Sequence, residues 1–187
     1  GVFSVLLAAS IGAAAVAQQS PRPMDWGDAP AGYPVTAAEN GARHVIGSGY
    51  LGAAVDAEQE GQHSADATWD DTNNSPDEDG VSVSPDPLVA CGDAILYVSP
   101  SRPGFVDAWI DFNGDAVWDS GWMSSEQIAA SVPVHPTTGA TDGFAIPFVV
   151  PCDAVGPGNA RVRFSFEGNL LPYDSSGYAP YGEVEDH

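Results

Sequence analysis

The chain has 187 residues, of which 43% are hydrophobic and 17% are charged, and its formal net charge is −21. The hydrophobic content excludes a disordered acidic tail, and the length suits one domain with short extensions. Nucleic acid and anionic membranes are excluded as favoured partners, because five arginines and no lysines stand against 26 acids. Bound divalent cations would offset the repulsion among these carboxylates, and a salt-adapted acidic surface explains the composition equally well.

The first part of the chain, residues 1–17, is apolar and uncharged. One interpretation is the hydrophobic region of an export signal, with an A-x-A cleavage site at residues 15–17. The other is a retained assembly segment, since the odd positions from Phe3 to Ala13 form an apolar face that suits a strand donated to a neighbouring subunit. An alanine-rich helix in a filament core fits the same residues. Residues 18–24 then form a polar, proline-containing linker.

The domain proper is predicted to span residues 25–187. Residues 25–80 are rich in Gly, Asp, Asn and Ser, and they predict loops with one or two short strands, one of them at residues 50–55. Short apolar or alternating runs then recur between prolines and glycines, and they predict an all-β, antiparallel, jelly-roll-like β-sandwich. These runs are residues 81–83, 94–98, 105–112, 144–150 and 160–166. The one predicted helix covers residues 124–130.

Two cysteines, Cys91 and Cys152, each end an apolar stretch, as cross-linked strand ends would. They supply too few ligands for a zinc site. In an exported protein we therefore expect one disulfide between them. Two buried free thiols are the alternative.

The clearest local motif is DFNGDAVWD at residues 111–119, in which acidic and amide side chains alternate as at the start of a calcium-binding loop. The candidate ligands are Asp111, Asn113, Asp115, the carbonyl of Val117, and Asp119. Ala116 replaces the glycine of such loops and Trp122 replaces the final glutamate, so this is not an EF-hand. The alternative is a polar hairpin turn held by Asx hydrogen bonds.

Three further acidic clusters are candidate Ca²⁺ ligands, each a weak signal alone. Their members are Asp70, Asp71, Asp77 and Asp79; Asp56 and Glu58; and Glu183 and Glu185. If the last cluster lies in a strand, Glu183 and Glu185 share one face. Solvated acidic loops are the alternative, but four clusters in a chain with few other charges indicate shared sites.

The chain resembles the GEVED domain, whose terminal motif stands at residues 182–186. The other landmarks of that family follow in order, namely DWGDAP (25–30), GARH (41–44), LG (51–52), VDAE (55–58), DEDGV (77–81), WIDFN (109–113) and ARVRF (160–164). The resemblance implies a β-sandwich module of bacterial extracellular or surface proteins, with no established enzymatic activity. Ala116 departs from the glycine usual in that family, which puts the geometry of its loop in question.

Catalysis by paired carboxylates, as in glycoside hydrolysis, would need exposed aromatic side chains, for which Trp69, Trp118 and Trp122 are candidates. The acids lie in calcium-like loops, however, and Trp109 lies in an apolar run that predicts core. We therefore do not expect an enzyme.

The scarce arginines Arg43, Arg161 and Arg163 predict at least one partly buried ion pair with a structural role. His44, next to Arg43, is expected to form a structural hydrogen bond. The sequence thus predicts a calcium-stabilised structural module of the bacterial cell surface, and a self-assembling fibre subunit if residues 1–17 are retained. An adhesion or glycan-binding module is the alternative. Expected partners are further copies of the chain, other surface proteins or a glycan.

Overall fold

The computed structural model describes residues 22–67, 78–119, 126–138, 143–166 and 174–187. The described chain is all-β apart from one short 3-10 helix, and no helix in it is long and apolar enough to span a membrane. The apolar segment 1–17 and the acids Asp70, Asp71 and Asp77 lie outside these ranges. The elements are β1 (Met24–Trp26), η1 (Ala37–Glu39), β2 (Arg43–Val45), β3 (Val81–Ser84), β4 (Asp93–Val98), β5 (Gly104–Ile110), β6 (Gln127–Val134), β7 (Phe144–Val149), β8 (Ala160–Ser165), β9 (Tyr178–Ala179) and β10 (Gly182–Asp186).

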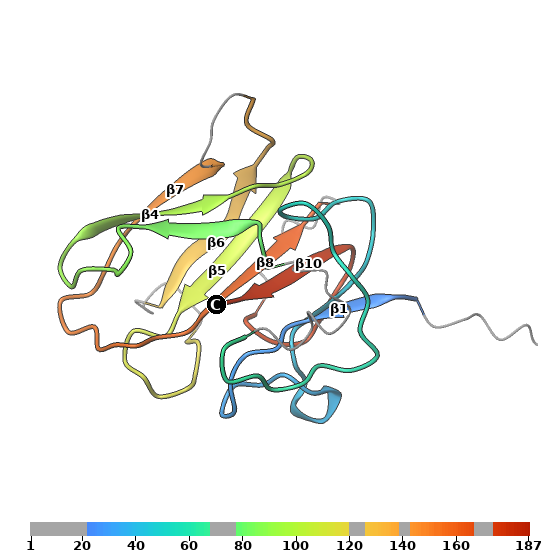
Figure 1. Cartoon of the computed structure of the whole chain (residues 1–187), viewed down its shortest axis with the longest axis horizontal. Coiled ribbons are helices and arrows are strands. Elements are labelled where there is room, and N and C mark those ends of the chain that lie inside the picture. The colour runs from blue at the N-terminus through green and yellow to red at the C-terminus, as the bar shows by residue number, and fades with distance from the viewer. Residues whose placement is uncertain (1–21, 68–77, 120–125, 139–142, 167–173) are drawn as a thin grey trace, which may run out of the picture.

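Two sheets form the body of the molecule. One has the strand order β10-β8-β5-β6 and the other has the order β3-β4-β7 (Figure 1). All neighbouring strands in these two sheets are antiparallel. This arrangement is consistent with the predicted β-sandwich, and a jelly-roll-like strand path stays a prediction.

The core between the two sheets follows from the alternation of side chains along each strand. In β4, Ala94, Leu96 and Val98 are buried while their neighbours are more exposed. In β8, Val162 and Phe164 enter the same hydrophobic cluster, together with residues of β5, β6 and β7. The five strands predicted at 81–83, 94–98, 105–112, 144–150 and 160–166 are all present, with ends within two residues of those expected.

A second layer covers the outer face of the four-stranded sheet, which explains why β8 and β10 are buried on both faces. There Trp109 of β5 packs with Ala29, Tyr33 and Val35 from the N-terminal segment. A third sheet with the order β1-β2-β9 lies on this side, and Figure 1 shows β1 beside β10. Trp109 is fully buried, so its predicted place in a core is confirmed.

Two predicted elements are wrong. Residues 127–130 of the expected helix instead begin β6, where Gln127 pairs with Trp109 and Ala129 pairs with Ala108. Pairing with a buried neighbouring strand outweighs the modest helix preference of such a short segment. The strand expected at residues 50–55 is reduced to one isolated bridge between Leu51 and Pro100.

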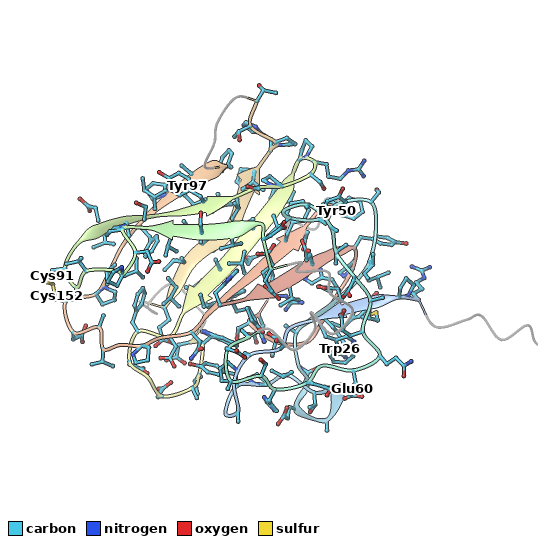
Figure 2. All side chains as sticks on the ribbon, in the orientation of Figure 1. Trp26, Tyr50, Glu60, Cys91, Tyr97 and Cys152 are labelled. Atoms are coloured by element: carbon cyan, nitrogen blue, oxygen red, sulfur yellow. A yellow bond between two sulfur atoms is a disulfide. The ribbon has the colours of Figure 1, made fainter. Side chains whose placement is uncertain are left out.

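The disulfide between Cys91 and Cys152 is confirmed. It joins the start of β4 to the end of β7, at one end of the three-stranded sheet (Figure 2). The two cysteines are 61 residues apart in the chain. A link over such a distance restricts the unfolded chain strongly, which stabilises the folded state.

Replacing both cysteines with serine should lower the free energy of unfolding by about 4 kcal/mol, the loop-closure contribution expected for a loop of this length. Equilibrium denaturation in urea, comparing the oxidised protein with the double variant, measures this difference. Equal denaturation midpoints for the two proteins would show that the link contributes no stability.

Candidate functional site

The centre of the second layer is an ion pair between neighbouring strands. Arg161 of β8 lies directly opposite Asp186 of β10, and both side chains are fully or almost fully buried. The arginine donates from Nε to Oδ1 at 2.7 Å and from Nη2 to Oδ2 at 2.6 Å. Such a two-pronged contact is the strongest arrangement that an arginine and a carboxylate form. The ion pair predicted from the scarcity of cations is therefore confirmed, and it is more deeply buried than expected.

The same arginine also joins three loops to the sheet. Its Nη1 donates to the carbonyl oxygens of Pro34 at 3.2 Å and Ser175 at 3.0 Å. Its guanidinium carbon lies 4.3 Å from the centroid of the Trp118 ring, and this ring also stacks on Tyr33. All these partners compensate the guanidinium for its lost hydration.

The DWGDAP motif is explained by its closeness to this pair. The N–H of Ala29 donates to Asp186 Oδ2 at 2.9 Å. A Cβ at Gly27 would lie 2.5 Å from that oxygen and 2.7 Å from Arg161 Nη2, so only glycine fits there.

A second buried arginine sits two residues further along β8. Arg163 Nε donates to His44 Nε2 at 3.1 Å, and its other nitrogens donate to the carbonyl oxygens of Asp174, Ser176 and Gly177. His44 Nδ1 therefore carries the proton and donates to the Pro180 carbonyl at 2.8 Å. The structural hydrogen bond predicted for His44 is confirmed. Burial, reinforced by the charge of Arg163, holds the pKa of His44 well below its usual value.

Carboxylates cap the free edge of β10. The strand pairs with β8 on one side, and the N–H groups of Val184 and Asp186 point to the other side. Asp25 accepts from Val184 N at 2.6 Å, and Glu78 accepts from Asp186 N at 3.0 Å. An edge strand that would otherwise be open to pairing is thus closed by side chains.

The two glutamates of the GEVED motif hold a neighbouring segment. As predicted, Glu183 and Glu185 share a face of β10, where both are fully buried. Glu183 accepts from the N–H of Leu51, and Glu185 accepts from the N–H of Gly80 at 3.2 Å. We call Asp25, Glu78, Glu183, Glu185 and Asp186 the β10 carboxylates.

Two of the β10 carboxylates form, together with His187, a group with the composition of a metal site. Glu78, Glu185 and His187 each place a ligand atom within 4.8 Å of the others. Glu185 lies 3.2 Å from His187 Nε2. Burial raises the pKa of Glu185, and the contacts with His187 and Gly80 offset part of this rise.

Two further predicted acids of this region, Asp79 and Glu58, also accept hydrogen bonds from backbone N–H groups. Asp79 accepts from Ala53 at 2.9 Å, and Glu58 accepts from Trp26 at 3.0 Å. Asp56, which is half-buried, lies two residues before Glu58 in the same segment. Roles for Asp56, Glu58 and Asp79 as metal ligands stay predictions.

The loop 111–119 contains the Asx hydrogen bonds that were the alternative to a calcium loop. Asp111 Oδ1 accepts from the N–H groups of Asn113 and Gly114, and its Oδ2 accepts from Ala116 N at 3.0 Å and from the Tyr33 hydroxyl at 2.5 Å. Ala116 has a φ of 63°, which explains why glycine is usual at this position. Burial alone would raise the pKa of Asp111, but these four hydrogen bonds lower it.

A glutamate that sequence reasoning missed completes this cluster. Asp111, Asp115 and Glu126 place ligand oxygens within 4.8 Å of one another. Glu126 arrives because β6, which follows it, pairs with β5, which precedes Asp111. No local sequence signal identifies it, since it belonged to the expected helix. Burial raises the pKa of Glu126, and the charges of Asp111 and Asp115 add to the rise.

The other predicted ligands of this loop surround the cluster. The Asn113 amide donates to Asp115 Oδ2 at 3.0 Å, and Val117 N donates to Asp115 Oδ1 at 2.9 Å. Asp119 N donates to Glu126 Oε2 at 2.8 Å. Coordination of a metal by Asn113, Val117 or Asp119 stays a prediction.

The aromatic residues named for a sugar site are not arranged as one. Trp118 is buried at 3% exposure between Tyr33 and Arg161, so its predicted exposure is wrong. Trp69 and Trp122 lie outside the described residues.

The strands that carry this site lie in the part of the chain that matches a protein-family model. The model of the GEVED domain matches residues 105–187, which include β5 to β10, Arg161 and Asp186. The predicted resemblance to the GEVED domain, an extracellular type of module, is therefore confirmed over this part of the chain. No curated protein and no solved structure matches the chain.

Removing the arginine of the buried pair between Arg161 and Asp186 should be strongly destabilising. Arg161→Met leaves Asp186 charged and buried, which should lower the free energy of unfolding by about 3–5 kcal/mol in urea denaturation. The matched control is Arg102→Met, since Arg102 is exposed and lies over Phe166. The control should lose about 1 kcal/mol or less. Similar losses in both variants would contradict a central role for the pair.

The neutral state of His44 should make the protein sensitive to mild acid. The unfolded chain takes up a proton near pH 6.5 and the folded chain does not, so stability is lost as the pH falls below that value. Between pH 6.5 and 5 the loss should reach about 2 kcal/mol. His44→Gln retains a donor and an acceptor without titrating, so its stability should fall less over this range. Parallel pH profiles of denaturation midpoints would contradict the assignment.

Proposed function

We propose that the chain is a calcium-stabilised, non-catalytic structural module of the bacterial extracellular surface. The observation that carries the proposal is the cluster of Asp111, Asp115 and Glu126. Its three carboxylate groups converge within 4.8 Å, and two of them are buried. Like charges at this distance repel strongly in a poorly hydrated place, and a hard oxygen-binding cation removes that repulsion.

The roles of the other acids support a structural rather than a catalytic task. The β10 carboxylates bind backbone N–H groups of segments far away in the chain, such as Val184 and Leu51. A carboxylate committed to such bonds holds loops in place and is poorly suited to move between protonation states during a reaction. The net charge of −21 adds a second reason for bound cations, because it destabilises the compact state.

Calcium should raise the melting temperature of the purified chain, and a chelator should lower it. At a free calcium concentration of about 100 times the dissociation constant, one site adds about 2.7 kcal/mol, which corresponds to roughly 5–10 °C for a chain of this size. Differential scanning calorimetry in CaCl₂ and in EDTA measures the difference, with MgCl₂ as a test of cation choice.

Variants locate the site. Asp115→Asn and Glu126→Gln should each reduce the calcium-dependent rise in melting temperature. Asp93→Asn is the matched control, because Asp93 is exposed on β4 and outside both candidate metal groups. Identical melting in calcium and in EDTA would overturn the calcium claim, and an undiminished rise in both variants would move the site elsewhere.

A further inference from the structure

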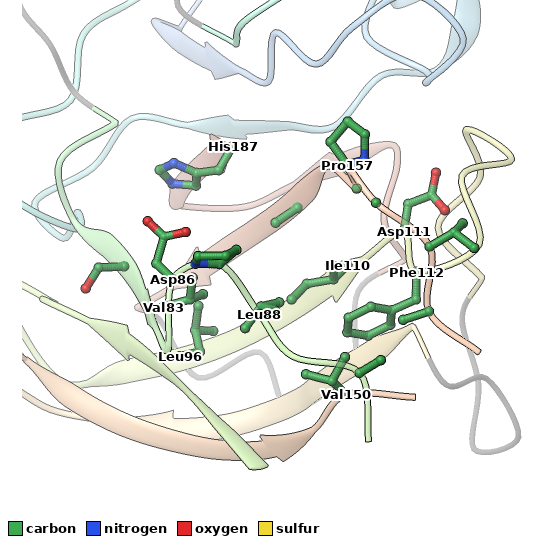
Figure 3. Close-up of a pocket in the computed structure, with 18 of the residues that line it drawn as sticks. Val83, Asp86, Leu88, Leu96, Ile110, Asp111, Phe112, Val150, Pro157 and His187 are labelled. Carbon is green, nitrogen blue, oxygen red and sulfur yellow. The ribbon is translucent and has the colours of Figure 1, made fainter. Parts of the chain in front are cut away.

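An apolar cavity opens between the two sheets at the end of the sandwich that contains His187. Its volume is about 720 Å³. Leu96 comes from one sheet and Ile110 from the other, while Leu88, Phe112 and Val150 come from the adjoining loops (Figure 3). Leu96, Ile110, Phe112 and Val150 belong to the buried hydrophobic core, so the cavity reaches that core.

One wall of this cavity is an edge strand. Val81 and Val83 of β3 are half-buried against the cavity, while Ser82, at its rim, and Ser84 are exposed. In the described chain, β3 pairs with β4 on one side and with no strand on the other. It contains neither lysine nor proline, and no described carboxylate caps it in the way that Asp25 caps β10. An uncapped edge beside an apolar cavity is suited to accept one more strand.

Residues 1–17 have the composition that such a strand needs. They carry no charge, whereas the chain as a whole carries −21, so they can approach another copy without the repulsion that its acidic surfaces would cause. Their odd positions present Phe3, Val5, Leu7 and Ile11 on one face. Alternation with a period of two lets one face enter the cavity while the backbone pairs with β3.

We propose that residues 1–17 of one copy add as a strand to β3 of a second copy and fill its cavity with their odd-numbered side chains. This inference rests on the structural role proposed above and names the partner as another copy of the chain.

The first residue of the described chain lies away from the cavity. The described chain begins at Arg22, whose Nη1 donates to the Tyr181 hydroxyl at 2.9 Å. Tyr181 precedes β10, whereas His187, which lines the cavity, follows it. The start of the described chain and the cavity therefore lie at opposite ends of β10. A head-to-tail contact between copies extends into a filament when its rotation does not close a ring.

Cysteine cross-linking of the full chain tests the pairing. One copy carries a cysteine on the outward face of the segment, at Leu6, Ala8 or Ser10 in turn, and the other carries Ser82→Cys on β3. Oxidation of an equimolar mixture should give a cross-linked dimer of the two variants for at least one of these positions. Ala145→Cys is the matched control, since Ala145 is exposed on β7, the opposite edge of the same sheet. The two native cysteines are joined to each other and do not interfere.

Assembly itself is measured by sedimentation velocity and electron microscopy. Wild-type chains should form polymers, and Leu7→Asp should remain monomeric with an unchanged melting temperature, because it places a charge in the apolar face. Cross-linking to Ala145→Cys as strong as to Ser82→Cys would overturn the proposal. It would also be overturned by cross-links within a single chain carrying both cysteines, with none in the mixture, or by a secreted protein that begins near Gln18. None of these results alters the calcium-dependent melting, so failure of the inference is distinguishable from failure of the proposed function.

Discussion

The buried contact between Arg161 and Asp186 is the interaction on which the arrangement of the second layer depends. It joins β8 to β10, and its remaining donors and acceptors reach Ala29, Pro34 and Ser175. A buried guanidinium is tolerated only when all its charge and hydrogen-bonding capacity is matched. The loops from these two distant parts of the sequence must therefore take their positions together, and they cover a face of the sheet that would otherwise be open.

This architecture gives many of the acidic side chains a specific structural role. The β10 carboxylates are backbone acceptors, placed where an edge strand or a loop would leave an N–H group without a partner. Long loops rich in glycine have little apolar area to bury. Hydrogen bonds to charged groups therefore contribute a larger share of the free energy that holds these loops in one conformation. Calcium bound at clustered carboxylates would act in the same sense, by holding loops that the hydrophobic core does not reach.

The edge strands β10 and β3 differ in how their unpaired backbone groups are covered. β10 is capped by Asp25 and Glu78, whereas the described surroundings of β3 leave one side of that strand without a pairing strand, next to an apolar cavity. Capping one edge prevents unwanted pairing, and an accepting edge permits one chosen partner. In the proposed assembly this asymmetry would set a direction, because the described chain begins at Arg22 near the Tyr181 end of β10 and the cavity lies at the other end.

The amino-acid sequence alone was sufficient to predict the all-β class, the five strands with clear alternation, the resemblance to the GEVED domain and the disulfide. These features depend on local patterns, such as the alternation of Val162 and Phe164 with the arginines of β8, or on motifs of fixed spacing. The sequence also predicted that Glu183 and Glu185 share a face. Only the tertiary structure decided what each carboxylate contacts. Glu126 joins Asp111 through the pairing of β5 with β6, and Asp186 meets Arg161 through the register of β10 on β8. Such contacts depend on strand register across many intervening residues, which local composition does not encode.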